Sequence, residues 1–377
     1  MINLPLNRLK PGMVMAQSVF NSSGASYLSR GQRLTISYIE KLRHMGIRDI
    51  HVSSTVPDGP DIPLPEDVLE ERTRAIAVKR VYDMFEQVRG EGTFDPVPLG
   101  KASAAIINDI TERRNNLVQL TDLRVHDMYT FAHSVNVAML SSLLGMLCGL
   151  SERELSELAM GTLMHDIGKL DIPKEILNKP GRLDDGEFRT IQRHPIIGSE
   201  IIRSMKVPNA EQLSIVARQH HERVDGKGYP DHRQGKQIHI YGKIVALADV
   251  YDALTSVRPY KKAYAPSVAY HIMTNCSAGH FDEELSRLFF SNVAIYPVGT
   301  VLDTTMGYGI VRKVEFGKTD RPVVCVFADK DLRCLEKPFD VDFSEEARET
   351  IHKVLNDTEL LHFIHQMQFD PASLLEE

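Results

Sequence analysis

The chain has 377 residues, of which 42% are hydrophobic and 25% charged, a composition that is typical of folded globular proteins and argues against a largely disordered one. Its formal net charge of −7 argues against a partner that is a nucleic acid polymer, because surfaces that bind DNA or RNA carry an excess of Lys and Arg. The length favours two or three domains.

Residues 1–60 alternate short apolar stretches with glycine and polar turns, and they predict a small, potentially regulatory α+β module with a helix at 36–46 and a strand at 47–54. The Pro- and Asp-rich residues 54–67 predict a linker. Residues 66–89 are helix-forming with their charges on one side, so 61–97 is predicted to be a linker and connecting helix. That helix is either solvated or a contact of a homodimer.

Residues 98–290 predict an all-α domain, because nearly every segment between turns has helical periodicity. The most hydrophobic run, 135–150, is shorter than the roughly 18–20 residues that a membrane span needs, and Asn136, Ser141 and Ser142 interrupt it. We therefore expect a buried core helix, no membrane span and a mainly α fold.

After residue 290 the chain changes to β-branched runs joined by Gly, Lys and Asp turns, which predict a small β-rich appendage with a terminal helix over 291–377. Gly307-Tyr308-Gly309 is interpreted as a hairpin turn rather than a phosphate loop, since no helix follows it. The four cysteines, Cys148, Cys276, Cys325 and Cys334, have no CxxC spacing and lie in apolar contexts. This pattern predicts reduced core cysteines in a cytoplasmic protein.

The stretch TLMHDIGKLD, residues 162–171, places His165 and Asp166 among apolar residues, with Lys169 one helical turn later. A buried carboxylate is unfavourable unless it is paired or bound to a metal. Mixed imidazole and carboxylate ligands suit hard or borderline divalent metals, and the cysteines of a soft site are missing. The candidate ligands of the helical region are His133, His165, Asp166, His194, His220, His221, Asp249 and Asp252.

These candidates exceed the needs of one ion, but two ions that share Asp166 would use them. Lys169, at i+3 from Asp166, is expected on the same helix face, where its ammonium can contact a phosphate oxygen. The stretch RQHHERVDGKGYPDH, residues 218–232, predicts a helix end followed by a glycine-rich loop. Arg258 and the lysines at 261–262 are either a solvated cluster or contacts to a second phosphate or a guanine base.

Taken together, seven ordered blocks over roughly 120–290 resemble the HD-GYP family of cyclic-dinucleotide phosphodiesterases, a subgroup of the HD metal-dependent phosphohydrolases. The blocks are YTFAHSVNVA, HDIGK, IPKEILNKPGRL, HPIIG, HHERVDGKGYP, ADVYDAL and RPYKKA. The segment LKPGMVMAQSV is also similar, more weakly, to a module often found before such domains.

The resemblance implies two divalent ions per chain, with iron or manganese expected. It implies one ion held by His133, His165, Asp166 and Asp249, and a second held by His194, His220 and His221, with Asp166 as the bridge. Asp166 and Lys169 would be catalytic, Lys169 by orienting the scissile phosphate. The implied contacts to the dinucleotide are Lys169, Arg258, Lys261, Asp225, Gly228, Tyr229 and Pro230.

One position departs from the family pattern. Some members have a Glu four residues before the first His ligand, and this Glu supports a third metal together with the Asp at the position of Asp252. Here the position is Tyr129, whose neutral phenol is a poor ligand, so the resemblance implies two metals rather than three. This departure also leaves open whether the product is carried on to mononucleotide.

The activity implied is hydrolysis of cyclic di-GMP to linear pGpG, with GMP after a second cut. Two alternatives stay open at this point. The substrate could be cyclic GMP-AMP, or the chain could be a signalling module that binds a cyclic dinucleotide and recruits protein partners through its GYP loop with little turnover. The complete set of ligands for two metals favours catalysis.

Overall fold

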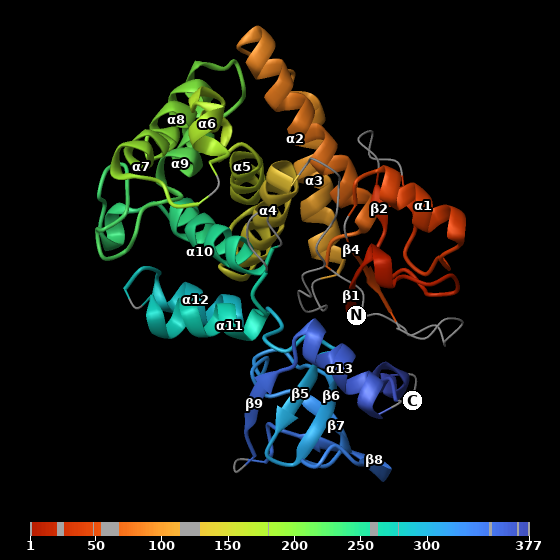
Figure 1. The fold of residues 1–377 in the computed structure, drawn as a ribbon. Coiled ribbons are helices and arrows are strands. Elements are labelled where there is room, and N and C mark those ends of the chain that lie inside the picture. The colour runs from red at the N-terminus through yellow and green to blue at the C-terminus, as the bar shows by residue number, and fades with distance from the viewer. Residues whose placement is uncertain are drawn as a thin grey trace.

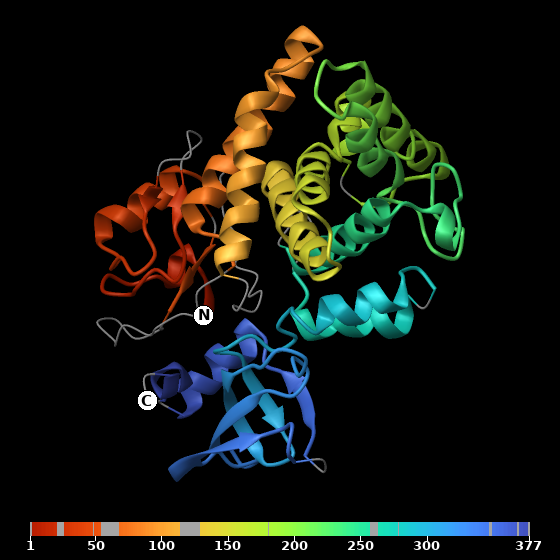
Figure 2. The same ribbon diagram turned by 180° about the vertical axis from the view of Figure 1, so that it is seen from behind.

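The computed structural model describes residues 2–20, 26–47, 49–53, 68–113, 129–179, 181–256, 263–277, 279–346, 349–367 and 369–375. A body of helices lies beside a small N-terminal α+β module and a C-terminal sheet, which confirms the mainly α expectation (Figure 1). Seen from behind, helices α2 and α3 lie between the N-terminal module and α4 (Figure 2).

The N-terminal module, residues 2–53, has two small antiparallel sheets, β1 with β4 and β2 with β3. Its elements are β1 (Ile2–Pro5), β2 (Val19–Phe20), β3 (Ser26–Leu28), α1 (Ile36–His44) and β4 (Asp49–Val52). The side chain of Thr35 accepts a hydrogen bond from the Tyr38 amide at 3.2 Å, which caps α1 at its start. The predicted helix and strand of this region are both confirmed.

The helical region begins with α2 and ends with α12. Its elements are α2 (Glu71–Glu91), α3 (Pro96–Glu112), α4 (Tyr129–Leu147), α5 (Glu152–Leu163), α6 (Lys174–Leu177), α7 (Asp185–Ile191), α8 (His194–Ser204), α9 (Ala210–Gln219), α10 (Ile240–Thr255), α11 (Pro266–His271) and α12 (Glu283–Phe290). Short 3-10 helices at Ile167–Asp171 and Gly235–Gln237 and a π-helical turn at Ile272–Cys276 join them.

The apolar run predicted as a core helix forms α4, and its side chains belong to the largest hydrophobic core. This core joins α2, α3, α4, α5, α9 and α10, with fully buried members such as Ile106, Val135, Leu158, Val216 and Val245. Within the described part of the chain, no helix has both the length and the hydropathy to cross a membrane.

The C-terminal sheet has five antiparallel strands in the order β8-β7-β6-β5-β9, followed by α13 (Asp357–Met367). The strands are β5 (Val301–Thr304), β6 (Gly307–Lys313), β7 (Val323–Ala328), β8 (Cys334–Asp342) and β9 (Ile351–Val354). A 3-10 helix at Pro371–Leu375 follows α13. The sheet confirms the predicted β-rich appendage.

Two predictions for this region are wrong in detail. Gly307 and Gly309 lie in strand β6, and the hairpin turn precedes them at residues 305–306. Glycine is needed there because neighbouring atoms approach closely: a Cβ at Gly307 would lie 2.2 Å from the Ala328 carbonyl oxygen. Cys325 is buried, but Cys334 is exposed, because it begins the largely exposed strand β8 at the sheet edge.

The two ends of the chain share a second hydrophobic core. Leu4, Leu42 and Ile50 of the N-terminal module belong to it together with Phe327 of β7 and Phe363 of α13. No pattern in the sequence predicts that residues 1–60 pack against residues 291–377. The division of the chain into four parts stays a prediction.

Candidate metal centre

His165 and Asp166 lie in a turn and not on a helix. Helix α5 ends at Leu163, and the 3-10 helix that carries Lys169 begins at Ile167. The expectation of one continuous helix face is therefore wrong. Lys169 still lies over Asp166, with its Nζ 2.5 Å from Oδ2, because three residues complete one turn of a 3-10 helix.

Gly168 fixes this turn against the start of α8. A Cβ at Gly168 would lie 2.1 Å from the carbonyl oxygen of His194 and 2.5 Å from the amide nitrogen of Gly198. Only glycine permits this approach of two backbones. The contact brings His194, the first residue of α8, beside Asp166.

Backbone carbonyls orient three of the predicted histidine ligands through Nδ1. The pairs are His165 with the Thr162 oxygen at 2.7 Å, His194 with the Ile191 oxygen at 2.7 Å and His220 with the Ala217 oxygen at 2.8 Å. A carbonyl oxygen only accepts hydrogen bonds, so each Nδ1 must carry the proton. In the neutral ring the lone pair is then on Nε2, which is the form of imidazole that binds metals.

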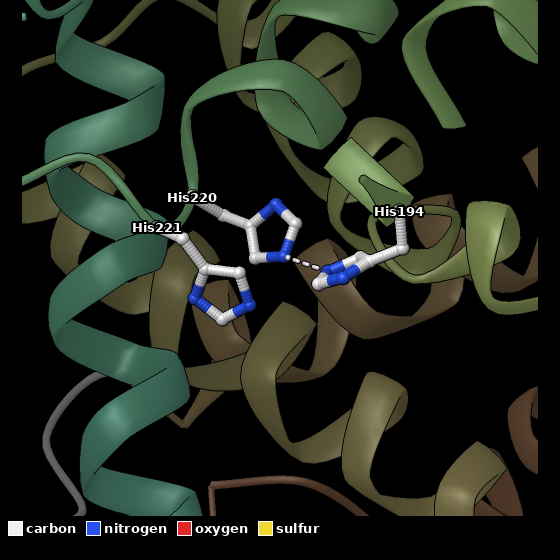
Figure 3. Close-up of side chains that lie close together, drawn as sticks. All are labelled: His194, His220 and His221. Carbon is white, nitrogen blue, oxygen red and sulfur yellow. Dashed lines mark hydrogen bonds between the residues drawn. The ribbon is translucent and has the colours of Figure 1, made fainter. Parts of the chain in front are cut away.

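The Asp166 carboxylate lies between two groups of possible ligands. Its Oδ1 is 3.5 Å from His194 Nε2 and 3.9 Å from His220 Nε2, while its Oδ2 is 3.4 Å from His165 Nε2. The first group is His133, His165 and Asp166, and the second is His194, His220 and His221; within each group the ligand atoms lie within 4.8 Å of one another. Figure 3 shows the second group, in which the His194 and His220 rings point toward each other.

His133 is held between two carboxylates of α10. Its Nε2 is 3.1 Å from Asp249 Oδ1, and its Nδ1 is 2.6 Å from Asp252 Oδ2. Burial alone would lower the pKa of His133, but the hydrogen bonds to Asp249 and Asp252 outweigh burial and raise the pKa to about 9. Asp249 Oδ2 also lies 3.7 Å from His221 Nδ1, so this carboxylate contacts both groups.

Asp252 has a role that the sequence did not suggest. Besides His133, its carboxylate accepts hydrogen bonds from Asn136 Nδ2 at 2.9 Å and from Ser256 Oγ at 2.8 Å. The family pattern pairs the position of Asp252 with a Glu where this chain has Tyr129, and in this structure the Asp252 carboxylate contacts Nδ1 of His133. The side chain of Tyr129 lies outside the described residues.

Burial sets the protonation of the other ligands. It lowers the pKa of His194 to about 3 and that of His221 to about 4, and it lowers the pKa of His220 well below its ordinary value. Burial would raise the pKa of Asp166, but Lys169 and His165 outweigh it and hold that pKa well below the ordinary value. Neutral imidazoles and an ionised carboxylate are the forms that bind divalent metals.

A divalent cation fits this set of donors. Among the described residues, His165 Nε2 and Asp166 Oδ1 are buried atoms without a hydrogen-bond partner. Leaving a buried polar atom unpaired typically costs about 1–3 kcal/mol, and coordination of each atom to a metal ion would remove that cost. The donor set and the two unpaired atoms therefore both indicate a metal centre.

The loop after α9 packs on the second group. The Tyr229 ring centroid is 4.7 Å from that of His221, and the Tyr229 amide donates a hydrogen bond to the His221 carbonyl oxygen at 3.1 Å. Gly228 has no room for a side chain, because a Cβ would lie 2.4 Å from the Arg223 amide nitrogen. Pro230 follows Tyr229 in this loop, which therefore lies against a predicted metal ligand.

Glu222 holds the loop, a role that sequence reasoning missed. Its buried carboxylate accepts hydrogen bonds from the Asp231 amide at 2.7 Å and the Arg233 amide at 3.0 Å. Asp225, predicted as a substrate contact, uses its carboxylate within the loop, where it accepts from the Arg223 side chain and the Lys227 amide. The sequence contained one signal for this role, because Glu222 directly follows His220-His221.

Arg258 and Lys261, the predicted contacts to the dinucleotide, lie outside the described residues. The structure brings all seven predicted metal ligands together around Asp166 and Asp249, and it places Lys169 beside them. The roles of these residues in metal binding and catalysis stay predictions.

Comparison with known proteins places the chain in a family. The family model of the HD domain matches residues 104–285. The chain is 30% identical over 354 residues to "Cyclic di-GMP phosphodiesterase PA4108" of Pseudomonas aeruginosa, a match that covers 86% of this chain and 84% of that protein.

Two further relatives match over shorter stretches. The response regulator RpfG of Xanthomonas campestris, named a cyclic di-GMP phosphodiesterase, is 38% identical over 167 residues, 44% of each chain. The "3'3'-cGAMP-specific phosphodiesterase 2" of Vibrio cholerae is 36% identical over 177 residues, 47% of this chain and 34% of that protein.

The helical fold and its cluster of histidines and aspartates define an HD-domain protein. More particularly, the chain belongs to the HD-GYP family of cyclic-dinucleotide phosphodiesterases, which confirms the resemblance seen in the sequence. It is therefore an enzyme that cleaves phosphodiester bonds.

Proposed function

We propose that this enzyme hydrolyses cyclic di-GMP to linear pGpG in a metal-dependent reaction. The observation that carries the proposal is the Asp166 carboxylate, which faces both groups of histidines and has an Oδ1 without a hydrogen-bond partner among the described residues. The choice of substrate is supported by the match to 84% of the length of PA4108, a protein named for cyclic di-GMP.

We assign two ions to the site, with iron or manganese suited to its mixed nitrogen and oxygen ligands. The first ion would be held by His133, His165, Asp166 and Asp249. The second would be held by His194, His220 and His221, with Asp166 shared between the two. When bound, such a pair supplies a water acidic enough to act as a nucleophile near neutral pH.

Lys169 is assigned to the scissile phosphate. Its side chain is 26% exposed and its Nζ contacts Asp166 Oδ2, so the ammonium lies at the edge of the cluster with donors left for a phosphoryl oxygen. There its charge would offset the negative charge that develops as the phosphate is attacked. The oxygen of water bonds to phosphorus, the bond from phosphorus to the 3′ oxygen breaks, and the 3′ oxygen takes up a proton.

The loop residues Gly228, Tyr229 and Pro230 are assigned to a wall of the substrate site, because the Tyr229 ring lies against His221. Asp225 would act there indirectly, since its hydrogen bonds to Arg223 and the Lys227 amide shape the loop. Arg258 and Lys261 are proposed as contacts to the second phosphate or a guanine base.

The test uses full-length protein purified without oxygen, with metals counted per chain and products followed by chromatography. We expect two ions per chain and conversion of cyclic di-GMP to pGpG. Asp166→Asn should lose bound metal and turnover. Asp171→Asn, which changes an exposed carboxylate at the end of the 3-10 helix that follows Asp166, should retain both. Wild-type turnover by Asp166→Asn would refute the assignment of Asp166.

Cyclic GMP-AMP is the second candidate substrate, favoured by the identity to the Vibrio cholerae enzyme named for that dinucleotide. The same chromatographic assay separates the two, since each substrate is offered alone and in competition. If cyclic GMP-AMP is hydrolysed faster than cyclic di-GMP at equal concentration, cyclic GMP-AMP is the preferred substrate. Release of GMP from pGpG would show that the reaction continues past the linear dinucleotide.

A further inference from the structure

A row of buried hydrogen bonds joins α2 to the predicted metal ligand His133. Arg74, which is 1% exposed in the first turn of α2, donates from Nη1 to Asn136 Oδ1 at 2.5 Å. Asn136 donates from Nδ2 to Asp252 Oδ1 at 2.9 Å, and Asp252 Oδ2 lies 2.6 Å from His133 Nδ1. Three hydrogen bonds, through the side chains of Asn136 and Asp252, thus connect a cation on α2 to a predicted ligand on α4.

The chemistry of the row fixes the orientation of each member. The guanidinium only donates and the Asp252 carboxylate only accepts, so the Asn136 amide must present its oxygen to Arg74 and its nitrogen to Asp252. The carboxylate then receives hydrogen bonds from Asn136, Ser256 and His133. An imidazole whose Nδ1 is held in this way directs its Nε2 toward the metal centre.

Burying an arginine inside a helical core is unfavourable unless its partners compensate for lost hydration. Arg74 Nη2 also contacts Met139 Sδ at 3.6 Å, so Arg74 contacts α4 at two positions, Asn136 and Met139. A lysine would keep the charge at this position but not the planar fork that reaches both atoms. Hence the guanidinium shape, and not only its charge, suits the site.

We propose that Arg74 is a positioning residue for the metal centre: it holds Asn136 and Asp252 so that His133 presents Nε2 to its ion. The inference rests on the proposed metal-dependent function. Arg74 does not touch the ligand itself, so its effect should be seen in metal affinity and should depend on Asp252.

The same turn of α2 also contacts the N-terminal module. Glu71, three residues before Arg74, accepts a hydrogen bond from the Ser18 amide at 3.2 Å and another from the Ser18 hydroxyl. A movement of the module against α2 would therefore displace the turn that carries Arg74. Through this turn the N-terminal module has a physical route to the metal centre.

The test is a calorimetric titration of chelator-treated full-length chain with Mn²⁺, with folding checked by circular dichroism. Arg74→Lys retains the buried charge and most of the side-chain volume, and we expect it to weaken Mn²⁺ binding by about 10-fold or more. Arg72→Met is the matched control, because Arg72 is exposed in the same turn, and it should bind as the wild type does.

A double-mutant cycle separates positioning from general destabilisation. If Arg74 acts through Asp252, adding Arg74→Lys to Asp252→Asn should weaken Mn²⁺ binding no further. Glu71→Ala, which frees α2 from Ser18, should weaken binding in the same direction as Arg74→Lys, and unchanged binding would remove the N-terminal module from the route.

The failures are distinguishable. A wild-type chain that binds no Mn²⁺ would overturn the proposed function and this inference together. If the wild type binds Mn²⁺ and folded Arg74→Lys binds it with the same affinity, only the role of Arg74 is overturned. The same holds if the losses of Mn²⁺ affinity from Arg74→Lys and Asp252→Asn add in the double variant.

Discussion

Replacing Gly168 by alanine should reduce both the stability of the helical region and its capacity to bind metal. The added Cβ would lie 2.1 Å from the His194 carbonyl oxygen and 2.5 Å from the Gly198 amide nitrogen. Both obstacles are backbone atoms, so no side-chain rotation relieves the contact. The two segments must separate by more than about 1 Å to reach ordinary van der Waals distance.

The magnitude follows from the kind of strain. Overpacking of a well-packed core typically costs about 1–3 kcal/mol, and a contact between two backbones should lie at the upper end of that range. Gly100→Ala is the matched control: Gly100 lies inside α3, and its Cβ would meet nothing within 4 Å. The same added methyl should stabilise that helix by about 0.5–1 kcal/mol, so the two variants should differ in sign.

Separation of the two segments would also move His194 away from Asp166. In the structure His194 Nε2 lies 3.5 Å from Asp166 Oδ1. The assay combines urea unfolding followed by circular dichroism with a count of metals per chain. We expect lower stability and less bound metal in Gly168→Ala, with neither loss in Gly100→Ala. A Gly168→Ala variant with wild-type stability and full metal would refute the close approach of the two backbones.

Three further predictions concern the loop, the metal and pH. In Glu222→Gln, one of the two oxygens that accept from the Asp231 and Arg233 amides becomes a donor. The change should raise KM and lower the free energy of unfolding by about 1–3 kcal/mol. An unchanged KM would argue against a loop that borders the substrate. Removal of metal by a chelator should lower Tm, and added Mn²⁺ should restore it. With the free ion at 100 times its Kd, one bound ion adds about 2.7 kcal/mol to the free energy of unfolding. A Tm that does not depend on metal would contradict the site. Burial lowers the pKa of His51 from 6.5 to about 4, so the unfolded chain takes up a proton that the folded chain does not, and stability should fall as pH falls from 6.5 to 4. His51→Gln should reduce that fall in pH-dependent unfolding, and an equal fall in both proteins would show that His51 is not its source.

The candidate ligands could be chosen from the sequence because metal chemistry limits which residue types can serve. Asp166 and Asp249 were conspicuous as carboxylates among apolar residues, and the paired His220-His221 had no structural explanation of its own. The structure places these side chains together. Local sequence was enough to predict that these side chains lie together, because each candidate ligand lies in its own recognisable block.

The supports of the ligands could not be predicted, because they depend on contacts between distant segments. Arg74 lies 62 positions before Asn136, and Asn136 lies 116 positions before Asp252. A signal was present at Asn136, a polar residue in an apolar run three positions after His133, but it was interpreted only as an interruption. The turn at Gly168 was likewise predicted as helix, since its close contact with α8 is tertiary.

Several predictions from the sequence are still untested. The contacts of Arg258 and Lys261, the effect of Tyr129 on the number of metals, a homodimer, protein partners of the GYP loop and a cytoplasmic location all stay predictions.

The core shared by the two ends of the chain has a consequence for folding. Leu42 and Ile50 are synthesised about 300 residues before Phe327 and Phe363, which belong to the same core. The apolar surface of the N-terminal module therefore stays exposed until β7 and α13 have been synthesised and pack against it. Contacts between such distant parts of a chain form slowly. Truncation after residue 290 should leave the helical region with its own core but an N-terminal module prone to aggregation.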